Sequence, residues 1–294
     1  IGLSAGFLHH IVPEINLINQ ELVEKIYKPR QRFSHKGTFG HALLLAGSYG
    51  KTGAALLAAK ACMHSGVGLL TVGVPQCAYL VLQVGLPEAM VTSDEKKNNL
   101  ATIMPNYSAY QAVGIGPGIG TEKKTRQWLL QQLLVIQCPL VLDADALNAI
   151  AYEEKWHCIP KNSILTPHPK EFDRLFGQFE THFDRLKFAR DFCISHQLNL
   201  VVKGANTVIC LSDGRQIFNS SGCKHMATAG VGDVLTGMLT SFLGQGYSPE
   251  AAMICGVFHH GLAGELAGKE KVRSMMASDL IDQIPASFKK LGVE

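Results

Sequence analysis

The sequence predicts an α/β protein with three layers: a mainly parallel central sheet and helices on both of its faces. Short, continuously apolar runs alternate along the chain with longer helical patterns, the order that builds a parallel sheet from strand–helix units. These runs lack the polar alternation of half-exposed strands, as expected for strands covered on both faces. The chain has 294 residues, of which 47% are hydrophobic, enough to bury the core of one large domain.

The first half of the chain begins with a short helix predicted near residues 21–27. Four apolar runs then predict strands: 42–46, 69–74, the run that starts at Ala112, and 139–145. Helices are expected at 54–64, where alanine is frequent and Ser65-Gly66 supplies an end, and at 121–134. The polar segment 91–108 predicts a loop or an edge of the sheet.

The second half continues the alternation. Residues 163–166 predict a short strand, after which Pro167 and Pro169 are expected to hold His168 in a loop, because proline disfavours a regular helix. An amphipathic helical region follows at 172–197. Three further strands are expected in 199–211 and 216–218, and helices are expected at 250–268, after a Ser248 cap, and at 278–291.

Composition excludes several classes of function. A net charge of +3 without a run of five basic residues argues against nucleic acid as a partner and for small molecules. Eight cysteines without a C-x-x-C pair favour neither zinc nor disulfides and indicate a reducing, cytoplasmic location. No apolar run approaches the roughly 18 residues of a membrane span. Residues 1–29 are expected to be a lead-in, with the domain at 30–294.

The segment 219–244 is the most informative stretch. Its first half is small and polar, and its second half has the apolar spacing of a buried helical face. Gly230 and Gly232 lie where that helix should begin, so unpaired backbone N–H groups there predict an anion site. Asp233 beside it could be the base that takes a proton during phosphoryl transfer, or it could cap the helix.

Other candidate residues follow predicted strands. Gly118, Asp143, His168 and Lys203 should converge with Asp233 at one edge of the sheet, where parallel sheets bind ligands. Asp143 and Asp145 could orient a metal or water, or one of them could cap the next turn. Neither a P-loop nor a Rossmann fingerprint is present, because Leu45 replaces the first P-loop glycine and the glycine spacing after Ala112 differs.

Taken together, seven segments resemble motifs of the ADP- or ATP-dependent NAD(P)H-hydrate dehydratases, a branch of the ribokinase-like superfamily. One motif alone would be weak, but seven in the family's order over about residues 30–290 are specific. They are His35-Lys-Gly-Thr-Phe-Gly40, Ala46-Gly-Ser48 with Gly53-Ala-Ala55, Gly114-Ile-Gly-Pro-Gly118, Leu142-Asp-Ala-Asp-Ala-Leu-Asn148, Leu165-Thr-Pro-His-Pro-Lys-Glu171, Val202-Lys-Gly-Ala-Asn-Thr207 and Ala227-Thr-Ala-Gly-Val-Gly-Asp-Val-Leu-Thr-Gly237.

The resemblance implies a ribokinase-like fold and repair of hydrated NADH or NADPH, with ADP or ATP as co-substrate and Mg²⁺ on its phosphates. It implies that Asp233 activates the ring hydroxyl while Gly230 and Gly232 bind the transferred phosphoryl group. The residues implied to contact the hydrated dinucleotide are Ala54, Gly118, His168 and Asp233. Those implied to hold the nucleotide are Lys203, Gly204, Ala205, Asn206, Thr207 and Gly232; metal ligands are not assigned.

Two positions depart from the family pattern. Cys223 replaces a usual Asn, and Val231 replaces a usual Ser or Thr, which removes donors near the phosphates. The family often has an N-terminal epimerase domain, whose tail the start at Ile1 resembles, and a homo-oligomer is expected. The alternatives are a related small-molecule kinase, against which Ala227 argues because sugar kinases usually have Asp there, and a nucleotide-binding protein without catalysis.

Overall fold

The sheet is almost entirely parallel, as predicted. The structure, a computed structural model, describes residues 16–292, and within them ten strands form one sheet in the order β1-β10-β9-β8-β7-β6-β5-β2-β3-β4. Only β9, among these strands, runs antiparallel to its neighbours. The strands are Asn16–Ile18 (β1), His41–Leu45 (β2), Leu69–Val74 (β3), Met90–Ser93 (β4), Ala112–Ile115 (β5), Leu140–Leu142 (β6), Ile164–Leu165 (β7), Asn199–Val202 (β8), Val208–Cys210 (β9) and Gln216–Asn219 (β10).

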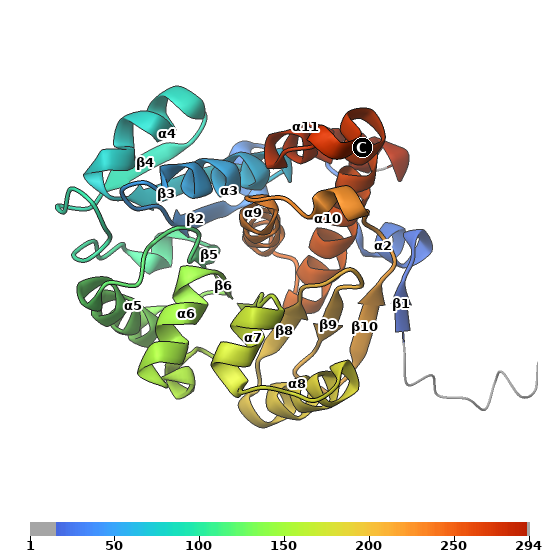
Figure 1. The fold of residues 1–294 in the computed structure, drawn as a ribbon. Coiled ribbons are helices and arrows are strands. Elements are labelled where there is room, and N and C mark those ends of the chain that lie inside the picture. Colours follow the sequence, from blue (N-terminus) through green and yellow to red (C-terminus); the bar gives the residue numbers. More distant parts are fainter. Residues whose placement is uncertain (1–15, 293–294) are drawn as a thin grey trace, which may run out of the picture.

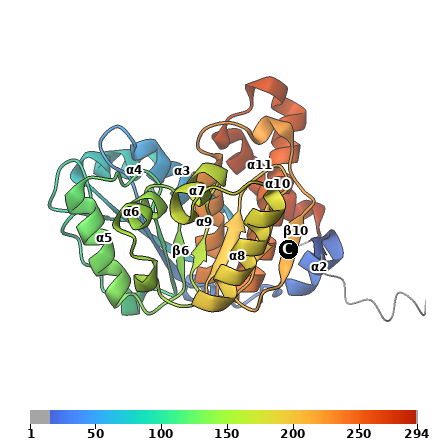
Figure 2. The ribbon, with the colours of Figure 1, turned by 60° about the horizontal axis from the view of Figure 1, so that its bottom comes forward.

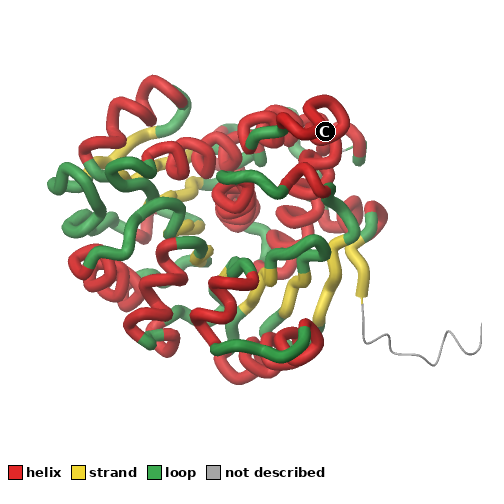
Figure 3. Tube along the Cα trace, viewed as in Figure 1, coloured by secondary structure: helices red, strands yellow, loops and turns green. Residues whose placement is uncertain are grey.

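Helices cover both faces of this sheet, which gives the predicted three layers (Figures 1 and 3). One face is covered by Lys123–Val135 (α5), Asp145–Glu153 (α6), Pro169–Phe176 (α7) and His182–His196 (α8), which lie in front in Figure 2. The helices gathered on the other face are Gln20–Ile26 (α2), Thr52–His64 (α3), Tyr79–Gly85 (α4), Val231–Gly244 (α9), Pro249–Lys271 (α10) and Ala277–Lys290 (α11).

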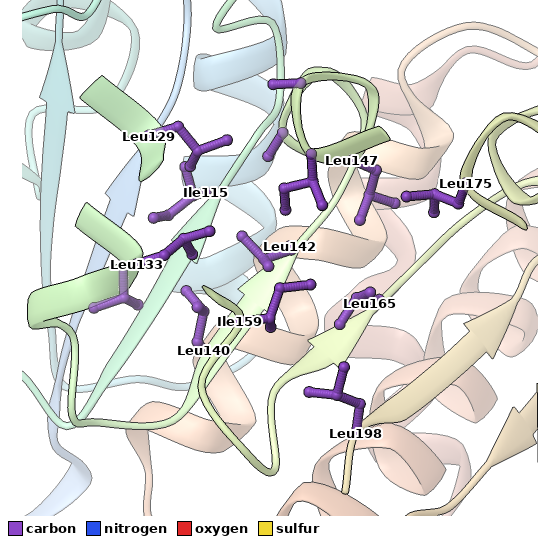
Figure 4. Close-up of a cluster of buried hydrophobic side chains, with 14 of the residues drawn as sticks. Ile115, Leu129, Leu133, Leu140, Leu142, Leu147, Ile159, Leu165, Leu175 and Leu198 are labelled. Carbon is purple, nitrogen blue, oxygen red and sulfur yellow. The ribbon is translucent and has the colours of Figure 1, made fainter. Parts of the chain in front are cut away.

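The apolar strands explain why both faces are covered. In β2, Leu43 and Leu45 belong to the hydrophobic cluster under α5–α8, whereas Ala42 and Leu44 pack with α3 on the opposite face. Successive side chains of a strand point to opposite faces, so a strand without polar positions must be buried twice. Figure 4 shows part of the first cluster, in which Leu129 and Leu147 lie near Ile115 and Leu142 of the sheet.

A close crossing of α3 and α9 fixes the second layer. A Cβ atom added to Gly237 would lie 2.0 Å from the carbonyl oxygen of Ala58, so only glycine allows the two backbones to approach this closely. The N-terminus of α9 lies at the carboxyl ends of the central strands. The crossing therefore positions Gly232 and Asp233, one helical turn before Gly237.

Most predicted elements are confirmed, including the three strands between residues 199 and 219 and the closing helix. The segment 91–108, predicted as a loop or an edge of the sheet, begins with the end of the edge strand β4 and continues mainly as loop. Three short elements, β1, α4 and α6, were not predicted. The predicted region 172–197 is two helices, because Gly177 adopts a φ of +95° after α7. The suggested resemblance of the start at Ile1 to an epimerase tail lies outside the described residues.

Candidate active site

The predicted residues at the carboxyl ends of the central strands lie close together. The Nζ atom of Lys203, after β8, is 2.7 Å from Oδ1 of Asp143, after β6. A Cβ atom on Gly232 would lie 3.5 Å from the same Nζ, which places the first turn of α9 beside this ion pair. Loops from separate strands thus meet at one edge of the sheet, where open α/β sheets bind ligands.

Asp143 is the hub of this cluster. Its side chain is almost fully buried, and its two oxygens are both used: Oδ1 binds Lys203, and Oδ2 accepts a hydrogen bond of 2.6 Å from the hydroxyl of Thr236 in α9. A buried carboxylate without such partners would strongly destabilise the fold. Neither Asp143 nor Asp145 caps α6, which has no side-chain cap, so the capping alternative for these residues is wrong.

Burial and neighbouring charges make Asp233 a weaker acid than an ordinary aspartate. Burial, first, and the negative charge of Asp143, second, raise the pKa of the Asp233 carboxyl from 3.8 to about 7, although Lys203 acts in the opposite direction. Asp145 and Glu171 raise this pKa further. A carboxyl group with a pKa near neutrality can both accept and release a proton, which is what general acid–base catalysis requires.

The N-terminus of α9 is open to a ligand. Its N-cap is Gly230, with a φ of +86° and no side-chain cap bond, so the first backbone N–H groups are not closed by a cap. Asp233 is in the first turn of this helix but does not cap it. His260 of α10 holds this turn in place, because its Nε2 lies 2.9 Å from the carbonyl oxygen of Val231. Burial lowers the pKa of His260 to about 4.

His168 is the N-cap of a helix, and the expectation that Pro169 would prevent a helix is wrong. Pro169 is the first residue of α7, a position where the missing N–H has no partner to lose. The Nδ1 atom of His168 accepts hydrogen bonds from the N–H groups of Lys170 and Glu171, and the Glu171 carboxylate accepts one of 2.9 Å from the backbone of His168. The proton of the neutral imidazole therefore lies on Nε2.

Glu171 links His168 to the central cluster. Its side chain is 6% exposed and lies 3.7 Å from Nζ of Lys203. Burial of Lys203 lowers its pKa, but the charges of Asp143 and Glu171 outweigh burial and leave the pKa raised, so this lysine is a cation. The sequence assigned Glu171 no role of its own, and its contacts with the N-terminus of α7 and with Lys203 were missed.

Gly118, in the loop after β5, and Ala54, in the first turn of α3, lie against each other. Gly118 adopts a φ of +63°, and a Cβ atom there would lie 3.1 Å from Cβ of Ala54 and 2.8 Å from the carbonyl oxygen of Lys51. The hydroxyl of Ser48 donates a hydrogen bond of 2.7 Å to the Gly118 carbonyl. Two glycine-rich loops, after β2 and β5, are thus joined, and they bring together Gly118 and Ala54, two of the four residues predicted to bind substrate.

A pocket of about 190 Å³ lies beside the N-terminus of α9 on the side of β8. The predicted nucleotide-binding residues that line it are Lys203, Gly204, Ala205, Thr207 and Gly232. Asn206 is exposed in the same turn but does not line the pocket. Cys223 and Val231, the two departures from the family pattern, both line it, and the Cys223 thiol lies 3.3 Å from the carbonyl oxygen of Gly264.

No ready-made metal centre is found among residues 16–292, where no three His, Cys, Asp or Glu side chains converge in the manner of a cation site. In the same part of the chain, no helix combines the length and apolar character that a membrane crossing requires.

Thr236 is a further residue of the site that sequence reasoning missed. The signal was available, because Thr236 lies one turn after Gly232 and Asp233 on a helix predicted to start there.

Known proteins of one family match the chain. The sequence profile of the NAD(P)H-hydrate dehydratase family matches residues 42–286. A bifunctional NAD(P)H-hydrate repair enzyme of Moorella thermoacetica is 37% identical over 90% of this chain and 52% of that protein, so the chain spans about half the length of this relative. The ADP-dependent (S)-NAD(P)H-hydrate dehydratase of Bacillus subtilis is 35% identical over 92% of this chain and 97% of that protein.

Solved structures agree. The crystal structure of an ADP/ATP-dependent NAD(P)H-hydrate dehydratase from Bacillus subtilis, co-crystallised with ATP and Mg²⁺, has a TM-score of 0.82 at 34% identity and covers 94% of this chain and 98% of that one. A ribokinase-like superfamily protein of Enterococcus faecalis has a TM-score of 0.84 at 25% identity, over 96% and 98% of the two chains. The chain therefore has a ribokinase-like fold and belongs to the NAD(P)H-hydrate dehydratase family.

Proposed function

We propose that this chain dehydrates the S epimer of NADH or NADPH hydrate, with ADP or ATP as phosphoryl donor, and so restores the reduced cofactor. The observation on which the proposal depends is the position of Asp233, a carboxyl group with a pKa of about 7, in the first turn of an uncapped helix. Family membership supports the choice of substrate, because matched relatives are named for this reaction.

The chemistry requires two steps. Asp233 accepts the proton of the ring hydroxyl, whose oxygen attacks the terminal phosphorus of the nucleotide, and the bond from that phosphorus to its bridging oxygen breaks. The N–H groups that follow Gly230, and the ammonium of Lys203, stabilise the negative charge on the transferred phosphoryl group. The ring nitrogen then expels phosphate, a better leaving group than hydroxide, and loss of a ring proton completes the reduced nicotinamide.

The nucleotide is proposed to bind in the pocket beside Lys203, Gly204, Ala205 and Thr207, with Asn206 at its rim. The hydrated dinucleotide is proposed to lie on the other side of Asp233, against Ala54, Gly118 and His168. This arrangement places the hydroxyl and the phosphoryl group on opposite sides of the base that must reach the hydroxyl. In an in-line transfer the attacking hydroxyl oxygen and the leaving oxygen lie on opposite sides of the phosphorus, so the hydroxyl must lie next to both Asp233 and the terminal phosphoryl group.

Mg²⁺ fits this site as a companion of the nucleotide. Magnesium keeps several waters and is usually held by phosphates with one or two carboxylates. Asp143, Asp145 and Glu171 each have a lysine ammonium nearby, at 2.7, 2.9 and 3.7 Å, so these carboxylates would contact the ion through its water shell. When bound, the ion would neutralise charge on the phosphates and orient them.

Turnover by the purified chain tests the proposal. The S epimers of NADH and NADPH hydrate are incubated with ADP or ATP and Mg²⁺, and the near-ultraviolet absorbance of the reduced nicotinamide is followed together with free phosphate. We expect the reduced cofactor and phosphate to appear in equal amounts, and only when nucleotide is present. Accumulation of a stable phosphorylated compound would instead indicate a kinase, and the absence of turnover with both hydrates a silent nucleotide-binding protein.

The membership of this chain in a longer protein, with an N-terminal epimerase domain, stays a prediction, as do a homo-oligomer and a cytoplasmic location. The half-length match to the Moorella thermoacetica protein is compatible with such a fusion. Sedimentation of the full-length protein would give its oligomeric state directly.

A further inference from the structure

Several carboxylates surround Asp233, and their negative charge opposes the approach of an anionic substrate. Asp143, Asp145 and Glu171 all raise the pKa of Asp233, so their charges act at the position of the reacting group. Lys203 is the partner of Asp143, and Nζ of Lys51 lies 2.9 Å from Oδ2 of Asp145. A dinucleotide has at least two negative charges on its pyrophosphate, and these two lysines offset part of the negative charge that it would meet.

The two lysines differ in exposure and in the number of carboxylates around them. The side chain of Lys203 is 18% exposed and lies near two carboxylates, whereas that of Lys51 is 52% exposed and has Asp145 as its ion-pair partner. Asp145 does not depend on Lys51, because its Oδ2 also accepts a hydrogen bond of 2.9 Å from the N–H of Gly120. An ion pair with such exposure contributes little stability. Lys51 can therefore exchange Asp145 for another anion at small cost.

Lys51 also lies where the substrate is proposed to bind. Its carbonyl oxygen and Cβ are 2.8 and 3.0 Å from the position that a Cβ atom of Gly118 would take, and Ala54 touches the same position. Cβ atoms added to Gly50 and Gly53, on either side of Lys51, would meet nothing within 4 Å, so the loop borders open space. The ammonium group thus has room to turn towards a ligand beside Gly118.

We propose that Lys51 binds the pyrophosphate of the hydrated dinucleotide and leaves Asp145 when the substrate enters. This inference depends on the proposed function. The pyrophosphate is favoured over the 2′-phosphate of the NADPH form because Lys51 pairs with Asp145, whose charge is felt at Asp233. The pyrophosphate is separated from the nicotinamide ring by one ribose only, whereas the 2′-phosphate lies at the far end of the molecule.

The test compares Lys51→Gln with Lys51→Arg, Asp145→Asn and the matched surface control Lys187→Gln, on the exposed side of α8. The KM and kcat of each variant are measured for both hydrates at saturating nucleotide, and the affinity for the products NADH and NADPH is measured by calorimetry. We expect Lys51→Gln to raise both KM values about tenfold and to lower the affinity for both products by about the same factor, the loss typical of one charge-assisted contact. The kcat values should be nearly unchanged. Lys51→Arg should restore most of this loss.

Three results would overturn the assignment: unchanged KM values and affinities, an effect confined to the NADPH forms, or an equal rise of KM in Asp145→Asn, which would show that Lys51 acts only through Asp145. Lys187→Gln is expected to keep the KM values of the wild type, and Asp145→Asn, which removes the carboxylate that competes with the pyrophosphate for Lys51, is expected to lower them. If the wild-type chain turns over neither hydrate, the proposed function fails, and the calorimetric comparison still decides whether Lys51 binds the dinucleotide.

Discussion

Asp233 is a residue whose neighbours, more than its own chemistry, decide what it can do. An exposed aspartate is fully ionised at neutral pH and is a poor base, whereas burial and the charge of Asp143 hold the pKa of Asp233 at about 7. Thr236 and Lys203 bind the two oxygens of the Asp143 carboxyl group and hold it in place near Asp233. Asp233 is therefore predicted to be a catalytic base that gains and loses its proton near neutral pH.

The rate of cofactor repair should follow this titration. We expect kcat/KM to fall as the pH drops below about 7, because the carboxyl group of Asp233 then holds its own proton and cannot take another. Asp143→Asn removes a neighbouring negative charge and should move this acid limb to lower pH by about one unit. The exposed Asp191→Asn on α8 is the control, and an acid limb at the same pH in both variants would contradict the assignment.

Ionisation of the same carboxyl group, which activity requires, should lower the stability of the fold. Because the pKa of Asp233 is higher in the folded chain than in the unfolded one, its ionisation destabilises the fold; this cost is absent below pH 4 and complete above about pH 7. Asp233→Asn should therefore raise the free energy of unfolding at pH 8 by on the order of 2 kcal/mol, and leave it unchanged near pH 4. Urea unfolding at the two pH values measures this difference, and an equal effect at both would contradict it.

At the scale of elements, α9 joins the packing of the fold to the site. Gly237 lets the helix cross α3 at backbone contact, and Gly230 and Gly232 leave its N-terminus accessible one to two turns earlier. The same residue type thus has a packing role at one position and a binding role at the others. Sequence spacing does not distinguish them, because all three lie within the eight residues 230–237.

Two alanine variants on this helix should separate the roles. In Gly237→Ala the new Cβ would lie 2.0 Å from a backbone oxygen of α3, so we expect a loss of about 3 kcal/mol of stability as the helices move apart. In Gly232→Ala the nearest atom is Nζ of Lys203 at 3.5 Å, so the fold should persist while turnover falls. Thermal unfolding and turnover of both variants check this, and a destabilised Gly232→Ala would contradict it.

Over the whole molecule, the alternation of apolar runs and helical patterns was sufficient to predict the layers and the mostly parallel sheet. It failed for β1, which has only three residues, and for α4 and α6, whose seven and nine residues complete only about two turns, too few for a helical period to be recognised. The error at Pro169 has a different cause: the sequence shows that a proline is present but not whether it lies within a helix or at its first residue, where it is favoured.

The site was predictable in part for the same reason. Residues at the carboxyl ends of parallel strands must lie at one edge of the sheet, so the meeting of Asp143, Lys203 and Gly232 followed from topology. The pairing within the cluster did not, because whether Asp143 faces Lys203, Thr236 or a metal depends on side-chain geometry that spacing does not contain.

The boundary at residue 29 between a lead-in and the domain stays a prediction. The described part of that lead-in packs on the domain: β1 pairs with β10, and Ile18 and Val23 are buried in the cluster under α10. Ile18→Ala should therefore cost about 3 kcal/mol of stability, whereas Leu17→Ala, on the same strand with a side chain 63% exposed, should cost little. Equal effects of the two variants in denaturant unfolding would mean that β1 is not part of the cooperative fold.

The most direct test compares wild-type chain with Asp233→Asn, supplied with the S epimer of NADPH hydrate, Mg²⁺ and either nucleotide. The asparagine side chain keeps the shape of the carboxyl group but cannot accept the hydroxyl proton, so the rate should fall by about a thousandfold. The rise in unfolding temperature caused by bound nucleotide should be preserved, because the pocket beside Lys203 is unchanged. Repair of the cofactor by Asp233→Asn at the wild-type rate would contradict the account.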